Sequence, residues 1–208
     1  MTVEESQRKI LEVTGILSKA TKSAVASSGT IHAETLVASL SRMSGAMLFR
    51  SFDLKVSGLA PGTVVLSEQA NKFGPSLMVM MFNTLRQLGH LELGEHSLLG
   101  HTESTALSQL SFAETQARLN PWFEKTRVAG RMGYSEIAHS AAISTAIQIH
   151  EYWSVLDVRS ACTIAVFGFV EGTKSVPLPF GDTPQAARVR PAADASPKPR
   201  QPWYKLWR

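Results

Sequence analysis

The chain has 208 residues, 44% of them hydrophobic, which is enough for one domain with a sizeable buried core. Its single cysteine, Cys162, excludes an internal disulfide framework and any zinc site built from several cysteines. No apolar run approaches the roughly 20 residues needed to cross a bilayer, and the first residues, MTVEESQRK, contain no hydrophobic leader region, so we expect a cytoplasmic protein.

The formal net charge of +4 is concentrated at the C-terminal end of the chain. Residues 182–208 hold six basic and two acidic residues, so this segment alone accounts for the excess. A protein that binds a nucleic-acid backbone usually concentrates positive charge on a folded face. Because the rest of the chain is balanced in charge, we do not expect nucleic acid to be the partner.

Two helices and an irregular segment are predicted in the first third of the chain. Residues 2–28 and 31–52 each repeat apolar residues at helical spacing. Gly45 lies inside the second run and indicates a close helix–helix approach, since glycine costs a helix about 1 kcal/mol relative to alanine. Residues 53–67 combine a Pro61-Gly62 turn with β-prone residues, which predicts a small β arm between helices.

Shorter helices are predicted in the middle of the chain. A capping serine begins one at residues 67–73, and a proline at the first helical position begins the next at residues 76–88. This second helix is apolar on nearly every side, so we expect it to be buried. Residues 103–119 predict a helix or a pair of short turns that stops before Pro121, which then begins another short helix ending at Gly130.

The longest segment without proline, Tyr134–Val170, predicts a central helix around which the others pack. At about 100° per residue, its alanines, Ile149, Trp153 and Leu156 form one apolar arc. The side chains predicted to face solvent are those of Ser140, Ser144, Gln148 and Glu151. After this helix, Ser175–Phe180 should be extended and lie across the body.

The composition changes at residue 181. Five of the ten prolines fall in residues 182–208, interspersed with alanine, serine and basic residues, which is typical of a disordered linker. We therefore expect an all-α fold: a single-domain bundle of about five to seven helices over residues 1–180. Residues 181–208 form the second unit, a proline-rich basic linker that ends in PWYKLWR.

Two sets of residues are candidate metal ligands. The segment GHLELGEHSLLGHTE gathers His90, Glu92, His96 and His101 in a glycine-rich loop, and their side chains suit zinc or a similar divalent cation. Their spacing matches no strong metal motif, and a solvated polar loop is the simpler interpretation. Glu136 and His139 form a Glu-x-x-His pair on one helix face, but no second pair completes a di-iron site.

The sequence contains no phosphate-binding glycine loop, no dinucleotide fingerprint and no nucleophile elbow, so no cofactor is predicted. The remaining feature is the aromatic C-terminal peptide, because disordered linkers are normally poor in aromatic residues. Its candidate partner-binding residues are Trp203, Tyr204, Lys205, Trp207 and Arg208. We call residues 200–208 the docking motif.

The predicted function is therefore that of a non-enzymatic cytosolic binding or assembly protein. Its docking motif would bind a partner protein, a neighbouring subunit or a groove on its own body, and peripheral contact with an anionic membrane is a further option. The alternative is a metal-binding helical protein or metal-dependent enzyme that uses the 90–103 loop or the Glu136/His139 face.

Overall fold

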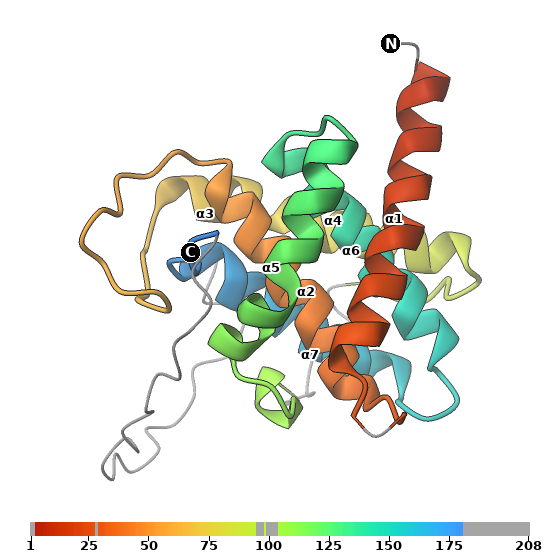
Figure 1. The fold of residues 1–208 in the computed structure, drawn as a ribbon. Helices are drawn as coiled ribbons and strands as arrows, with labels where there is room; N and C mark the ends of the chain where they lie inside the picture. Colours follow the sequence, from red (N-terminus) through yellow and green to blue (C-terminus); the bar gives the residue numbers. More distant parts are fainter. Residues whose placement is uncertain (1–2, 28, 95–97, 99–103, 181–208) are drawn as a thin grey trace, which may run out of the picture.

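The computed structural model describes residues 3–27, 29–94, 98 and 104–180 (Figure 1). This part of the chain is all-α, as predicted, and contains no strand, only two isolated β-bridges. Its helices are α1 (Val3–Val25), α2 (Ala33–Arg50), α3 (Glu68–Phe73), α4 (Pro75–Gln87), η2 (Thr105–Leu107), α5 (Phe112–Ala129), α6 (Tyr134–Glu151) and α7 (Val158–Lys174). None of these helices has both the length and the hydropathy to span a membrane.

Helix α2 is the centre of the bundle. It runs through the middle of the molecule, and all of its residues except Glu34 and Arg50 are buried (Figure 1). Its most extensive packing is against α7 and α6, and it also contacts α1 and α5. The prediction that residues 134–170 form the organising helix is therefore wrong, and the second predicted helix has that place.

The predicted helix Tyr134–Val170 is in fact two helices. The first, α6, ends at Glu151, and the second, α7, begins at Val158 after a turn in which Trp153 is 62% exposed. The carboxylate of Asp157 caps α7 by accepting a hydrogen bond from the backbone N–H of Ser160 at 3.0 Å. The apolar character of this turn continued the helical pattern in the sequence and concealed the break.

Of the four α6 side chains predicted to face solvent, Glu151 at the end of the helix is exposed, but the other three are buried. Ser140, Ser144 and Gln148 are all 0% exposed. The hydroxyl of Ser144 donates to the backbone carbonyl oxygens of Thr14 in α1 and of Ser140, each at 3.0 Å. A serine hydroxyl that bonds a backbone carbonyl can be buried at little cost, so small polar residues line the helix contacts here.

Helices α2 and α7 cross at unusually short range. A Cβ placed on Gly45 would lie 2.6 Å from the carbonyl oxygen of Phe169, and one on Gly172 would lie 2.3 Å from that of Arg42. A Cβ on Gly168 would lie 1.9 Å from the Oγ of Ser41. The close approach predicted from Gly45 is therefore confirmed, and glycines on α7 complete it.

An ion pair between a buried arginine and a partly exposed glutamate also joins α2 and α7. The guanidinium of Arg42, which is 4% exposed, donates from Nε to the Glu171 carboxylate at 2.7 Å. Its Nη1 donates to the carbonyl oxygen of Leu110 at 2.6 Å. Arg42 thus joins α2, α7 and the segment between η2 and α5.

The predicted β arm contains no strand. Residues 53–67, which we call the arm, instead make three backbone hydrogen bonds with the chain at the end of α7: Gly62 N–H to Val176 O at 2.8 Å, Val176 N–H to Thr63 O at 2.9 Å, and Val65 N–H to Lys174 O at 2.7 Å. Residues 175–180, which we call the strap, are non-helical, as expected. The arm and the strap support each other across the surface of the bundle.

Two other predictions need correction. Helix α4 is amphipathic rather than buried all round, since Val79 is 52% exposed while Leu77 and Met81 are fully buried. Helix α5 passes through Pro121 instead of breaking there. Proline has no backbone N–H to donate to the carbonyl four residues earlier in the helix. Pro121 is exposed, so its ring lies at the surface and does not disturb the core.

Candidate functional site

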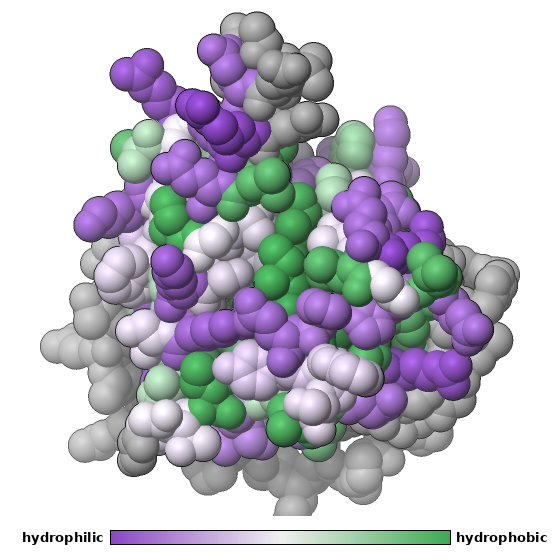
Figure 2. Space-filling model, turned by 90° about the vertical axis from the view of Figure 1, so that its right-hand side faces the viewer, coloured by the Kyte–Doolittle hydropathy of each residue, from purple (hydrophilic) through white to green (hydrophobic). Residues whose placement is uncertain are grey.

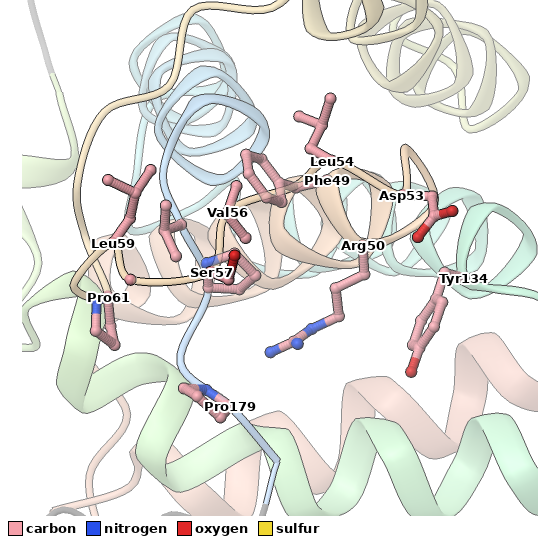
Figure 3. A pocket seen from close by; sticks show the side chains of 13 residues that line it. Phe49, Arg50, Asp53, Leu54, Val56, Ser57, Leu59, Pro61, Tyr134 and Pro179 are labelled. Atoms are coloured by element: carbon pink, nitrogen blue, oxygen red, sulfur yellow. The ribbon is translucent and has the colours of Figure 1, made fainter.

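A cavity of about 480 Å³ lies between the arm and the strap (Figure 3). This volume is in the range of small-molecule sites, ~300–1,000 Å³. Apolar side chains from α2, the arm and the strap form much of its wall: Phe49, Leu54, Val56, Leu59, Pro61, Val176, Pro177 and Pro179. The polar side chains on its wall are those of Arg50, Asp53, Ser57 and Tyr134.

Arg50 reaches this cavity from the last turn of α2. Its Nη2 donates a hydrogen bond to the carbonyl oxygen of Leu178, and its guanidinium carbon lies 3.9 Å from the centre of the Phe180 ring. The ring of Phe180 also stacks on that of Tyr134, with 6.3 Å between centroids and 8° between planes. Arg50 therefore fixes the strap, and through Phe180 it fixes the point at which the described chain ends.

The guanidinium of Arg50 is poorly compensated. Its Nε is enclosed and has no hydrogen-bond partner among the described residues. Burial lowers the pKa of Arg50, while Tyr134 and Glu124 raise it. Glu124 is itself engaged by the guanidinium of Arg127, at 2.6 and 2.8 Å. Arg50 is thus a partly buried cation without a carboxylate of its own.

A second pocket, of about 380 Å³, contains a serine–histidine pair. The Nδ1 of His139 lies 2.7 Å from the carbonyl oxygen of Ser135 and must donate to it, so the neutral ring presents Nε2 as an acceptor. Nε2 lies 2.9 Å from the Oγ of Ser76, at the start of α4. The Ser76 hydroxyl has an alternative acceptor in the Phe73 carbonyl oxygen, 2.7 Å away. A nucleophile (Ser76), a base (His139) and a group that orients the base (the Ser135 carbonyl) are thus joined by hydrogen bonds.

His90 and His150 also meet. The Nε2 of His90 lies 3.0 Å from the Nδ1 of His150, with the rings edge to face. Burial, and then the neighbouring His150, lower the pKa of His90. The pair connects the turn after α4 to the end of α6.

The structure brings together no metal site from the predicted ligands that it describes. Glu92 is exposed, and the Glu136 carboxylate accepts the backbone N–H of Gly133 at 2.7 Å as part of a helix cap. His96 and His101 lie outside the described residues. Within those residues, no three histidine, cysteine or acidic side chains are close enough to share an ion. The metal alternative stays a prediction for the remainder of the loop.

Hydrophobic side chains are exposed on the side of the molecule formed by α1 and the turn after α6. Figure 2 shows this side, with a hydrophobic band between hydrophilic areas. Four exposed hydrophobic residues belong to these two elements: Leu11, Ile16, Trp153 and Val155. A groove of about 470 Å³ between α1 and α5 adds Trp122, which is 46% exposed. The bundle therefore leaves apolar surface open to contact.

Cys162 supplies no nucleophile. Its side chain is fully buried in α7, and burial, followed by the charge of Asp157, raises the pKa of its thiol. The thiolate form that would react is therefore disfavoured.

Comparison with known proteins identifies no relative. No protein-family model, curated protein or solved structure matches the chain.

The candidate docking residues Trp203, Tyr204, Lys205, Trp207 and Arg208 lie outside the described residues. The sequence did not single out Arg50, Tyr134 or Ser76, because residues distant in the chain build both pockets.

Proposed function

We propose that this chain is a binding or assembly protein whose docking motif binds a partner protein. The observation that carries the proposal is the separation of roles along the chain. The body is balanced in charge and buries a core, while the segment after it is proline-rich and basic and ends in two tryptophans and a tyrosine. Aromatic and arginine side chains are those that contribute most to protein interfaces.

The way in which the body holds the strap supports this proposal. Leu178 receives hydrogen bonds at its carbonyl oxygen from Arg50 and from Asn120, and its N–H donates to Gln116. Phe180 is held between Arg50 and Tyr134. The docking motif therefore begins about 20 residues beyond a fixed point on the body. If the linker is as flexible as its composition predicts, its root-mean-square span is about 25 Å.

A fixed attachment and a short linker raise the local concentration of the motif near the body into the millimolar range. A motif with modest affinity of its own can then bind a partner that also touches the body. The exposed apolar surface of α1 and α5 is available for that second contact.

Removal of residues 200–208 and the double substitution Trp203→Ala/Trp207→Ala test the proposal. Both should leave the circular dichroism spectrum and melting temperature of the body unchanged and abolish association, measured by light scattering and by pull-down. Leu66→Ala is the control, since Leu66 is an exposed hydrophobic residue on the arm, outside the apolar surface of α1, α5 and the turn after α6. This variant should associate, and capture the same proteins in the pull-down, as the wild type does.

Two outcomes would contradict this proposal. The truncated chain could associate as the full chain does, which would remove the motif from the interaction. Alternatively, the motif could sediment with anionic vesicles and bind no protein, which would make the membrane its target.

The Ser76–His139 pair favours a second candidate function, hydrolysis of small esters. In that reaction His139 Nε2 takes the proton of Ser76 Oγ as the oxygen attacks the ester carbonyl. The same proton then passes to the departing alkoxide, and water repeats the sequence to release the acid. Apolar side chains beside the pair, Leu48, Phe52 and Phe73, would contact the acyl group.

Covalent labelling distinguishes this candidate. A fluorophosphonate probe should modify Ser76 in the wild type, detected by mass spectrometry of the labelled peptide, and His139→Gln should reduce the rate of labelling at least tenfold. Ser51→Ala should label normally, because the Ser51 hydroxyl lines the same pocket but donates to Leu48 O. An unlabelled Ser76 rules out hydrolysis by this pair.

A further inference from the structure

We propose that the cavity between the arm and the strap binds a small carboxylate with an apolar body, and that Arg50 holds the carboxylate. The inference does not rest on the function proposed for the docking motif. The argument rests on the position of Arg50, its unused hydrogen-bonding capacity and the composition of the wall.

Arg50 has donors to spare. A guanidinium carries five N–H donors, and among the described residues its one hydrogen-bond acceptor is the carbonyl oxygen of Leu178. The Phe180 ring lies 3.9 Å from the guanidinium carbon, and Figure 3 shows the guanidinium extending into the space between the arm and the strap. A planar fork of parallel N–H groups matches the two oxygens of a carboxylate.

The charge of Arg50 is also only partly compensated, since the carboxylate that favours it, Glu124, is hydrogen-bonded to Arg127. No carboxylate of the described residues lies within ion-pair distance of Arg50, although Arg42, about two turns earlier in α2, has Glu171 at 2.7 Å. A partly buried cation without a counter-charge is destabilising. An anionic ligand supplies that charge and relieves the cost, so the site selects for anions.

The acidic residue of the cavity does not replace the ligand. Figure 3 shows the guanidinium of Arg50 extending away from Asp53, toward the side where Ser57 and Pro179 lie. Asp53 lines the same cavity and forms no ion pair with Arg50. A ligand with one carboxylate therefore fits better than a dianion, whose second charge would approach Asp53.

The wall determines the rest of the ligand. Side chains of Phe49, Val56 and Leu59 face the space beside the guanidinium, so an apolar group next to the carboxylate is removed from water. Inorganic phosphate offers the same oxygens without that apolar group. We expect carboxylates such as benzoate to bind more tightly than phosphate.

The test uses the full chain labelled with ¹⁵N and titrated with benzoate, benzamide or inorganic phosphate. Benzoate should shift the amide signals of the arm and the strap saturably, with a dissociation constant on the order of millimolar. Benzamide, which has the same shape without the charge, should bind at least tenfold more weakly. Equal binding of benzoate and phosphate would overturn the apolar part of the proposal.

Two variants locate the binding. Arg50→Gln should weaken benzoate binding at least tenfold, but it also removes a contact to the strap. Leu59→Glu avoids that problem, because Leu59 is 45% exposed on the arm and lines the cavity. It should weaken benzoate binding about tenfold by repulsion and leave the melting temperature unchanged.

Leu66→Glu is the control, since Leu66 is on the same arm, 82% exposed and outside the cavity. It should bind benzoate like the wild type. Unsaturable shifts with benzoate, or equal affinities in the two leucine variants, would overturn the proposal.

Discussion

Replacing Gly172 with alanine puts a methyl group into the α2–α7 crossing, where backbone atoms already occupy the space. The added Cβ would lie 2.3 Å from the Arg42 carbonyl oxygen, 2.7 Å from the Ala46 nitrogen and 2.8 Å from the Gly45 Cα. A flexible side chain could move away, but these are atoms of a buried helix. The two helices must therefore separate along their contact.

The expected loss of stability is large for a single methyl group. Overpacking of a core typically costs about 1–3 kcal/mol, and separation of two helices belongs at the upper end. Alanine returns about 1 kcal/mol of helix propensity. We expect a net loss of about 2 kcal/mol in the free energy of unfolding, which for a chain of this size lowers the melting temperature by about 4–8 °C.

Gly15→Ala is the matched control. Gly15 is also inside a helix, but it is exposed and a Cβ there would have nothing within 4 Å. It should stabilise the protein by about 0.5–1 kcal/mol. Urea unfolding followed by circular dichroism measures both variants. If Gly172→Ala were as stable as Gly15→Ala, the close approach of α2 and α7 would be refuted.

Two further predictions concern charged groups. The pKa of His90 is lowered in the folded protein, so below about pH 6.5 the folded chain binds fewer protons than the unfolded chain. The contribution of His90 to stability is therefore fully present above about pH 6.5 and is lost as the pH falls. In the His90→Gln variant, the urea concentration at the unfolding midpoint should vary less with pH between about pH 7 and 5 than in the wild type. An unchanged pH dependence would contradict the role of His90. Glu171→Gln should cost about 1–3 kcal/mol, because it leaves the buried Arg42 without its counter-charge. Glu124→Gln, at a more exposed pair on α5, should cost at most about 0.5 kcal/mol by the same urea assay, and equal losses would contradict the importance of burial.

Sequence periodicity predicted the class of the fold and several helices, because those helices repeat apolar residues at helical spacing. Glycine and proline also marked positions reliably: Gly45 lies at a close crossing, and Pro75 is at the first position of α4. Local backbone chemistry of this kind depends on neighbours in the chain. It can therefore be recognised without the tertiary structure.

Burial of small polar residues could not be predicted in the same way. Ser39, Ser44 and Thr145 are all 0% exposed, although serine and threonine side chains are mostly found at protein surfaces. The hydroxyl of Ser44 donates to Ala138 O at 2.7 Å, and that of Thr145 to Ala141 O at 2.9 Å. These bonds offset the cost of burial at Ser44 and Thr145, whereas the Ser39 hydroxyl has no hydrogen-bond partner among the described residues. At Ser44 the acceptor lies on another helix. For this reason the sequence misplaced the centre of the bundle.

The candidate sites were hidden for a similar reason. Arg50 and the strap are joined across 128 positions of the chain, and Ser76 and His139 across 63. Neither pair has a fixed spacing that a sequence motif could reveal. The histidines that drew attention are present in the structure, but His139 bonds a serine and His150 bonds another histidine rather than a shared metal.

The crossing of α2 and α7 also constrains the order in which the protein can fold. Its ion pair joins residues 129 positions apart, and closing a loop of that length costs about 4 kcal/mol of chain entropy before any contact forms. A growing chain therefore cannot complete its core until Lys174 has been made. Until then the serine-lined and apolar surface of α2 lacks its main covering helix, and the nascent chain is most exposed to aggregation or to chaperones.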